Sequence, residues 1–363
     1  MRPIPSDPTI AVVGATGAVG EEFLRLIDER SFPHRAVRLF ASPRSAGKKL
    51  RVGAREVEVE PLREGCFAGV DIAFFSAGKG ISKEWCPRAT AAGAWAVDNS
   101  SAFRMDPACA LVIPEVNPGE LDALHAPATI AVPNCSTIIA LMAATPLHRA
   151  VGVERMVVAT YQAASGAGAA AMAELERQAR DFAAGRPLDT TIFGRQYLFN
   201  VFSHNSAVGA DGQNEEERKL VDETRKIWRD PSVMITGTCV RVPVLRAHSE
   251  AINFTFRRPI TEARAREVLA AAPGVEIVDD RAGNRFPEPL AAAGRDPVLV
   301  GRIRADPSQP EGYGLNLFVA GDQIRKGAAL NGIQIAELLM ERKGAPGAAP
   351  RATAATFAAS PGA

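Results

Sequence analysis

The sequence predicts an α/β protein of two domains, a doubly wound parallel sheet followed by an α+β domain with a mixed sheet. Three observations support this prediction. The chain has 363 residues, which is more than one typical domain contains. Short apolar runs alternate with helical patterns up to residue 134. Beyond it, longer β-rich segments alternate apolar with polar residues, as half-covered antiparallel strands do.

The first domain is expected to begin with a buried strand at 9–13, because all its residues except Thr9 are apolar. A helix at 18–29 follows, with Phe23, Leu26 and Ile27 on one face. The same alternation predicts further strands at 36–41, 70–75, 94–97, 111–113 and 129–132, and helices at 81–92 and 138–147.

The second domain is expected to hold its strands in one mixed sheet. Ile252, Phe254 and Phe256 alternate with polar residues, which indicates one buried and one polar face. The predicted strands are 157–161, 233–244 and 251–257, and the predicted helices are 167–184, 215–228 and 262–271. The predicted domains are therefore 1–134, completed by a periodic helix at 325–343, and 135–324; the Ala/Pro/Gly-rich tail 344–363 is predicted to be disordered.

Composition excludes several classes of protein. Hydrophobic residues make up 47% and charged residues 23%, which is typical of a globular chain. Lys plus Arg number 42 against 41 Asp plus Glu, so the formal charge of +1 argues against nucleic-acid or membrane-surface binding. The uncharged run 126–147 contains Pro133, Asn134 and Pro146, and it therefore predicts a strand, a turn and a helix instead of a membrane span.

The cysteines give no sign of a disulfide framework or a metal site. They are odd in number, widely spaced and without a Cys-x-x-Cys pair, so we expect neither disulfides nor bound metal. Residues 1–7 contain no apolar signal-peptide core, and we expect a reduced, cytoplasmic protein. The five are Cys66, Cys86, Cys109, Cys135 and Cys239.

A glycine-rich turn follows the first predicted strand and opens the first predicted helix. Glycines allow a tight turn and close approach to a pyrophosphate, and the helix start offers free N–H groups and a positive dipole. This context predicts a dinucleotide site of the Rossmann type, with a generic turn as the alternative. The residues concerned are Gly14, Thr16, Gly17, Ala18, Val19 and Gly20.

The end of the second predicted strand indicates which dinucleotide would bind. A site for NAD usually places an acid there for the ribose 2′-hydroxyl, but 36–49 contains no acid. Arg44 and Ser45 would instead suit a 2′-phosphate. The prediction is NADP, and the alternative is that these residues form a solvated basic loop.

Cys135 lies where the last strand of the first domain meets a helix, within Pro133-Asn134-Cys135-Ser136-Thr137. A thiol at a helix start has a lowered pKa and can act as a nucleophile. The alternative is an inert buried cysteine.

Further along, Arg241 on a predicted strand precedes His248 and Glu250, and could hold a carboxylate while His248 moves a proton. The alternative is a surface arginine on an ordinary strand, with Val240, Val242 and Val244 on its other face.

Together these motifs resemble the aspartate-β-semialdehyde dehydrogenase family over residues 10–339. Beyond the glycine turn and the cysteine segment, the resemblance rests on Asn99 to Arg104, Gln162 to Gly168, Arg241 to His248 and Asp322 to Glu337. It departs from the family at Lys79, where a glycine is common, and at Gln323, where an asparagine is common.

The resemblance implies a role for each matching residue. Cys135 would carry the acyl group, His248 would be the general acid/base, and Gln162 would orient the substrate. It also implies NADP, inorganic phosphate, a small-molecule substrate and a homodimer or tetramer. The substrate and phosphate would meet Arg104, Asn134, Glu216, Lys219 and Arg241; NADP would meet Thr16 to Val19, Arg44, Ser45, Ser165, Gly166 and Gln323.

Two alternatives stay open at this point. N-acetyl-γ-glutamyl-phosphate reductase uses the same cysteine chemistry, but it would have no use for an acid such as Glu216 beside a free amino group. A non-catalytic paralogue would keep only the fold; the presence of Cys135 and His248 argues against it.

Overall fold

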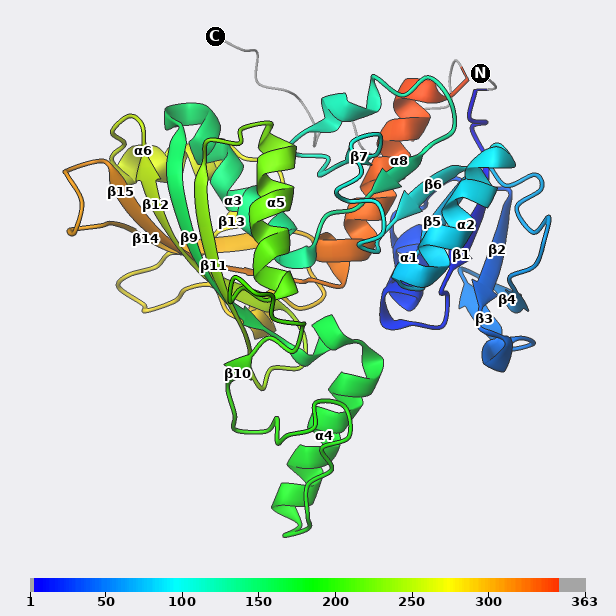
Figure 1. The fold of residues 1–363 in the computed structure, drawn as a ribbon, viewed down its shortest axis with the longest axis horizontal. Helices are drawn as coiled ribbons and strands as arrows, with labels where there is room; N and C mark the ends of the chain where they lie inside the picture. The colour runs from blue at the N-terminus through cyan, green and yellow to red at the C-terminus, as the bar shows by residue number, and fades with distance from the viewer. Residues whose placement is uncertain (1–2, 346–363) are drawn as a thin grey trace. The chain divides into compact units, whose positions relative to one another are not determined.

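The computed structural model describes residues 3–345, which form two compact units (Figure 1). The first unit runs to Pro133 and resumes at Ala328, and the second comprises Asn134–Gly327. The tail predicted to be disordered starts at Gly344, but Gly344 and Ala345 pair with Ile4; the rest of it lies outside the described residues. No helix within 3–345 combines the length and the apolar character that a membrane crossing needs.

The first unit contains an eight-stranded sheet in the order β3-β4-β2-β1-β5-β6-β8-β7. All neighbouring strands are parallel except β3 and β4, which form an antiparallel pair. Strand order reverses between β1 and β5, and ligands bind at such a switch point in open α/β sheets. The strands are β1 (Thr9–Val13), β2 (Ala36–Ala41), β3 (Lys49–Val52), β4 (Arg55–Pro61), β5 (Ile72–Phe75), β6 (Trp95–Asp98), β7 (Ala110–Leu111) and β8 (Thr129–Ala131).

Helices cover both faces of this sheet, because its strands are apolar on both sides. On one face Phe74 meets Phe23 of α1 (Ala18–Glu29), with ring centroids 4.8 Å apart, and α8 (Leu330–Lys343) packs against α1. On the other face Phe75 shares a cluster with Trp85 of α2 (Lys79–Ala91). The short helices are η1 (Pro43–Ser45) and η2 (Pro118–Leu121), and a π-helical turn η4 (Arg325–Ala329) precedes α8.

The second unit contains a seven-stranded mixed sheet in the order β10-β11-β9-β12-β15-β14-β13. β11 runs parallel to β9, whereas β12 runs antiparallel to both β9 and β15. The strands are β9 (Val153–Gln162), β10 (Phe202–Ser203), β11 (Met234–Arg241), β12 (His248–Phe256), β13 (Val275–Ile277), β14 (Val298–Ala305) and β15 (Gly314–Gly321).

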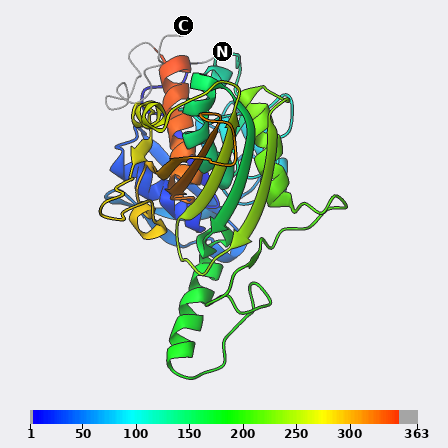
Figure 2. The ribbon, with the colours of Figure 1, turned by 90° about the vertical axis from the view of Figure 1, so that its left-hand side faces the viewer.

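One face of the second sheet is covered by helices and the other is not (Figure 2). The covered face packs against α3 (Cys135–Val151), while α5 (Glu215–Trp228) lies along β11. On the uncovered face Tyr161 and Phe318 lie with ring centroids 6.1 Å apart, and both are partly exposed. The remaining helices are η3 (Ala164–Ala167), α4 (Ala169–Ala183), α6 (Glu262–Ala270) and α7 (Pro289–Ala292).

The fold class is confirmed, and the bounds predicted for β1, β2, α1 and α5 are reproduced to the residue. Several other predicted bounds were wrong in extent, and two of them have a clear local cause. The strand predicted at 233–244 ends at Arg241, because Pro243 has no N–H for a ladder and Val244 N–H turns back to the Val242 carbonyl at 2.7 Å. Val240, Val242 and Val244 therefore do not share a strand face. The helix predicted at 138–147 spans 135–151 and continues past Pro146.

Candidate active site

The glycine turn of the first unit forms a close-packed cradle between β1 and α1. Gly14 has a φ of +88°, and a Cβ there would lie 2.8 Å from the Ser76 backbone. A Cβ at Gly20 would lie 2.1 Å from the Gly14 carbonyl oxygen, so neither position accepts a side chain. The N-cap of α1 is Gly17, and no side chain caps this helix start. The turn therefore suits a phosphate group held by backbone N–H groups.

The residues predicted to choose the cofactor lie beside this turn. Thr16 Oγ1 donates to Ser45 Oγ at 3.4 Å, which links the glycine turn to η1. Arg44, in η1, is exposed and makes no ion pair with any residue between 3 and 345 that the structure describes. A guanidinium in this position fits a 2′-phosphate, and the cradle and the cation together fit NADP.

Arg104 lies in the same unit, in the loop after β6, and is 7% exposed. Its Nε donates to the Val132 carbonyl at 2.9 Å and its Nη2 to the Asn99 carbonyl at 3.0 Å. These bonds fix the guanidinium against the backbone that leads to residue 133.

Cys135 is the first residue of α3, in the second unit, and its thiol lies at the positive end of the helix. Asn134 is the N-cap, and its Oδ1 accepts from the N–H groups of Ser136 at 3.0 Å and Thr137 at 3.3 Å. Cys135 is half-buried, whereas the other four cysteines are buried. Burial raises the pKa of the Cys66 thiol, that of Cys86 far above its usual range and that of Cys239 to about 12. Position and exposure thus single out Cys135 as the candidate nucleophile.

Three predicted site residues come together in one row across the second sheet. Arg241 of β11 lies opposite Gln162 of β9, and His248 of β12 lies on the other side of Gln162. Ala163 N–H donates to His248 Nδ1 at 3.0 Å. Burial, together with the charge of Arg241, lowers the pKa of His248 to about 3, so the ring is neutral near pH 7.

Arg241 is buried at 3% exposure and is not a surface residue of the polar strand face. Its Nη1 donates to the Ala163 carbonyl at 3.1 Å and its Nε to Asn205 Oδ1 at 3.1 Å. Gly166 leaves room for these groups, because a Cβ there would lie 2.8 Å from Arg241 Nη1 and 2.9 Å from His248 Nε2. The arginine and the histidine therefore converge on Gly166.

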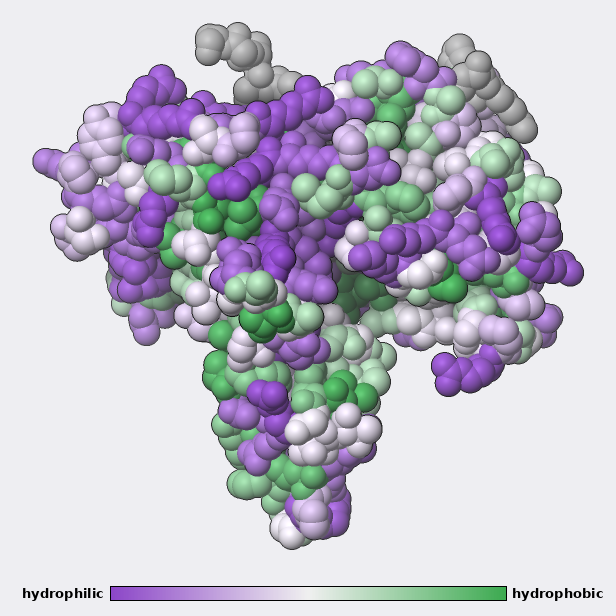
Figure 3. All heavy atoms as spheres, viewed as in Figure 1, coloured by the Kyte–Doolittle hydropathy of each residue, from purple (hydrophilic) through white to green (hydrophobic). Residues whose placement is uncertain are grey.

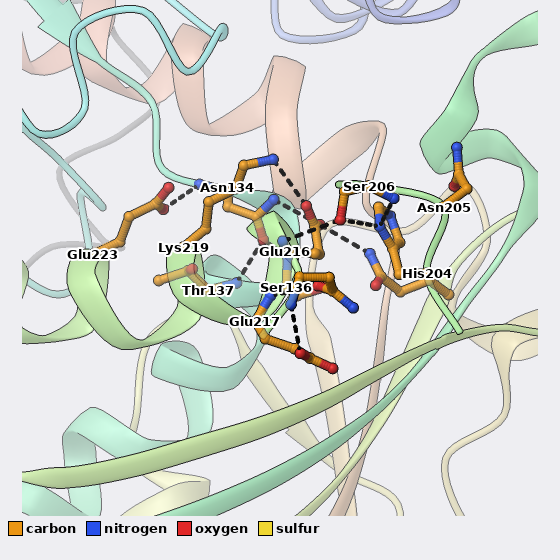
Figure 4. Close-up of polar contacts among 12 residues, drawn as sticks. Asn134, Ser136, Thr137, His204, Asn205, Ser206, Glu216, Glu217, Lys219 and Glu223 are labelled. Carbon is orange, nitrogen blue, oxygen red and sulfur yellow. Dashed lines mark hydrogen bonds and ion pairs between the residues drawn. The ribbon is translucent and has the colours of Figure 1, made fainter. Parts of the chain in front are cut away.

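Glu216 is the centre of a buried polar cluster at the start of α5 (Figure 4). Its carboxylate accepts from Asn134 Nδ2 at 2.8 Å, Gln162 Nε2 at 3.1 Å and Lys219 Nζ at 3.0 Å. Although burial acts to raise the pKa of Glu216, the charge of Lys219, nearby His204 and the hydrogen bonds from Asn134 and Lys219 hold it well below its usual range. Glu216 and Lys219, both implied as site residues by the resemblance, thus form an ion pair whose acid is buried.

The remaining predicted cofactor residues lie next to β12, the strand that begins with His248. Gln323 Nε2 donates to Ser165 Oγ, and Gln323 Oε1 accepts from Ala247 N–H at 2.9 Å. Gln323, where the family commonly has asparagine, therefore links η3 to the turn before β12. The other departure, Lys79, is the first residue of α2.

Several polar residues of this region were not assigned a role from the sequence. Glu223 accepts from the Asn134 backbone, Thr160 donates to Gln162, and Asn205 binds Arg241. His204 is buried, and desolvation lowers its pKa to about 4. Glu250 is fully buried, and burial raises its pKa well above the usual value. Within 3–345, no group of His, Cys, Asp and Glu side chains is arranged to hold a metal ion.

A nucleotide-binding unit, and a second unit with a thiol at a helix start, an imidazole and a buried cation, fit the class of dehydrogenases that use a cysteine. Comparison with known proteins agrees. Residues 9–124 match the NAD binding domain of semialdehyde dehydrogenases, and residues 145–326 match their dimerisation domain. The chain belongs to the aspartate-semialdehyde dehydrogenase family.

Its relatives match over nearly their whole length. The aspartate-semialdehyde dehydrogenase of Synechocystis sp. is 50% identical over 93% of this chain and 99% of its own. That of Aquifex aeolicus is 46% identical over 92% and 98%. Among solved structures, aspartate semialdehyde dehydrogenase II of Vibrio cholerae complexed with ASA has a TM-score of 0.89 at 43% identity, covering 92% of this chain and 98% of that chain. The Candida albicans enzyme with NADP shares the fold, with a TM-score of 0.71 at 24% identity over 93% of this chain and 99% of that chain.

Proposed function

We propose that this chain is an aspartate-semialdehyde dehydrogenase, which converts L-4-aspartyl phosphate to L-aspartate 4-semialdehyde with NADPH and releases phosphate. This reaction serves lysine, threonine, methionine and diaminopimelate biosynthesis. The observation that carries the proposal is Cys135 at the start of α3, in the same unit as the buried row Arg241, Gln162 and His248. Membership of the family supports the assignment.

In this mechanism Cys135 is the nucleophile. The positive end of α3 favours the thiolate, which attacks the acyl carbon of aspartyl phosphate. The acyl C–O bond to phosphate breaks, and phosphate leaves with the electron pair and takes up a proton. The product is a thioester on Cys135, a suitable intermediate because a thiolate is both a good nucleophile and a good leaving group.

His248 is the acid/base group for the second step. NADPH, when bound, supplies the hydride that reduces the thioester. Because Ala163 N–H occupies Nδ1, the proton of the neutral ring lies on Nε2. Nε2–H stabilises the negative oxygen of the thiohemiacetal that Cys135 then carries, and the thiohemiacetal collapses to the aldehyde and the free thiolate.

Charge complementarity assigns the substrate groups. Arg241 is assigned to the α-carboxylate, Glu216 to the α-ammonium, and Gln162 to orientation of the acyl group. The buried Glu216 carboxylate, held ionised by Lys219, suits a free ammonium group. Arg104 and Lys219 are assigned to inorganic phosphate, and Asn134 to the backbone around the nucleophile.

The cofactor residues are assigned on the fit of the glycine turn and Arg44 to NADP. The turn would hold the pyrophosphate, and Arg44 with Ser45 would hold the 2′-phosphate. Ser165, Gly166 and Gln323 are assigned to the nicotinamide side, since Gly166 adjoins His248 Nε2.

We further propose a homodimer, with a tetramer as its higher assembly, built on the uncovered face of the second sheet. The dimerisation-domain match and the partly exposed Tyr161–Phe318 pair support this face. Apolar side chains also gather over the segment of α4 and the loop after it, where Phe182 is 57% and Phe199 68% exposed (Figure 3). Large exposed apolar groups of this kind mark interaction sites.

A reduced, cytoplasmic setting suits the five free thiols.

The experiment is an NADP reduction assay in phosphate with two substrates, aspartate semialdehyde and N-acetylglutamate semialdehyde. The proposal requires turnover of the first and a large loss with the second, because acetylation removes the ammonium that Glu216 would bind. Glu216→Gln should lower turnover of aspartate semialdehyde. Equal activity toward the acetylated aldehyde would move the assignment to the reductase.

A further inference from the structure

We propose that Glu223 is a positioning residue for the nucleophile: its carboxylate holds the backbone of Asn134 and thereby places Cys135. This inference rests on the proposed role of Cys135. It starts from a buried carboxylate in the middle of α5 that the mechanism above does not use.

Glu223 contacts the residue immediately before the nucleophile. Asn134 N–H donates to Glu223 Oε2 at 2.6 Å, and Figure 4 shows this carboxylate directed at the Asn134 backbone. A bond between an amide and a carboxylate is charge-assisted and stronger than one between neutral groups. Glu223 is 1% exposed and Asn134 6% exposed, so water cannot replace the carboxylate without rearrangement.

A second carboxylate of the same helix holds the side chain of the same asparagine. Asn134 Nδ2 donates to Glu216 Oε1 at 2.8 Å. Glu216 and Glu223 are seven residues apart, which is two turns and therefore one face of α5. Asn134 is thus held by its backbone and its side chain at two points along one helix.

The other polar groups of Asn134 are bound to the helix it caps. Its Oδ1 accepts from the Ser136 and Thr137 N–H groups, and its carbonyl accepts from Ile138 N–H at 2.9 Å. The asparagine therefore connects α5 to the first turn of α3, and Cys135 is the next residue in the chain. Because Glu216 and Lys219 also lie on α5, Glu223 fixes the nucleophile relative to the residues assigned to substrate.

The test compares three substitutions of Glu223 with a matched control in the same helix. Glu223→Met keeps the length of the side chain but removes the acceptor. Glu223→Asp keeps the charge but shortens the side chain by one methylene. Glu223→Gln keeps an acceptor at full length. The control is Trp228→Phe, which removes a different hydrogen bond between α5 and α3, Trp228 Nε1 to Thr145 Oγ1 at 3.0 Å, and keeps an aromatic ring against His148.

The first readout is turnover of aspartate semialdehyde. Misplacing a reacting group by about 1 Å costs about a hundredfold, so Glu223→Met and Glu223→Asp should lower kcat by about ten- to a hundredfold with little change in KM. Glu223→Gln should recover most of this loss. Trp228→Phe should lower the urea midpoint and leave kcat within about twofold, because the lost hydrogen bond stabilises the fold but does not hold Asn134.

The second readout does not depend on catalysis. The rate of Cys135 alkylation by iodoacetamide, followed by peptide mass spectrometry across pH, should change in the Met and Asp variants and remain near wild type in the Trp228 variant. If Glu223→Met does not fold, Glu223→Asp decides. Unchanged kcat and unchanged alkylation in a folded Glu223→Asp protein would overturn the inference. A wild type inactive on aspartate semialdehyde would instead remove the proposed function, and the alkylation rates would still test the placement of Cys135.

Discussion

Ala163 N–H donates a hydrogen bond to His248 Nδ1 at 3.0 Å. A backbone N–H can only donate, so Nδ1 must present its lone pair, and the proton of the neutral ring is on Nε2. Gly166 adjoins Nε2, and the Arg241 guanidinium adjoins Gly166. The tautomer of the acid/base group is therefore set by the residue that follows Gln162, and the nearby cation disfavours a second proton.

The buried histidine predicts a specific dependence of stability on pH. The pKa of His248 is lowered from 6.5 to about 3 by burial and by Arg241. Between these values the unfolded chain binds a proton that the folded protein does not, so the free energy of unfolding falls as pH falls below 6.5. The slope for one proton is about 1.4 kcal/mol per pH unit.

His248→Gln removes this contribution. Urea unfolding at pH 7, 6 and 5 should show a shallower loss of stability in the variant than in wild type. His125→Gln, at an exposed position, is the control and should leave the wild-type slope unchanged. Parallel curves for wild type and His248→Gln would show that His248 is protonated in the folded protein.

The orientation of the Gln162 side-chain amide depends on Thr160, two residues earlier on β9. Thr160 Oγ1 donates to Gln162 Oε1 at 3.2 Å, which directs Nε2 toward Glu216. Thr160→Val leaves this buried oxygen without its donor, and we expect kcat to fall about fivefold, as for the loss of about 1 kcal/mol. Thr160→Ser keeps the hydroxyl and should restore kcat. Steady-state assays decide; equal rates for Val and Ser would show that the hydroxyl has no such role.

Arg44 predicts the preference for NADP over NAD. Arg44→Ala should weaken NADP binding by about ten- to a hundredfold, the equivalent of about 1.5–3 kcal/mol for a charge-assisted bond, and should leave NAD binding unchanged. Lys48→Ala, which removes an exposed cation four residues away, is the matched control. Fluorescence titration with both cofactors measures the difference. If the two variants lose the same affinity, the loop contributes only its general positive charge.

Local patterns predicted the nucleotide-binding unit well. An apolar strand, a glycine turn and an amphipathic helix are determined by neighbouring residues, and 9–13 and 18–29 are correct to the residue. The strands β14 and β15 were not predicted, because Gly301, Arg302 and Arg304 interrupt the first and Gly314 and Asn316 weaken the pattern of the second. Their place in the sheet depends on pairing with each other and with β12, which is a tertiary effect.

The residues of the candidate site likewise fall into those that the sequence identified and those that only the packing reveals. Cys135 was predicted because a junction between a strand and a helix is visible in the sequence, whereas Glu216 and Lys219 were assigned only through the family resemblance. Glu223 was not predicted, because an acid in a helix of charged residues reads as solvated. Arg241 was expected on a polar face, and only the packing around it shows that it is buried.

The most direct test of the central claim is to find the acyl group on Cys135. Enzyme mixed with aspartate semialdehyde and NADP without phosphate, then quenched in acid, should carry an aspartyl group on the Cys135 peptide by mass spectrometry. Phosphate added before the quench should remove it, and Cys135→Ala should form neither adduct nor NADPH. Turnover in the Cys135→Ala protein, or an adduct on Cys239 instead, would contradict the account.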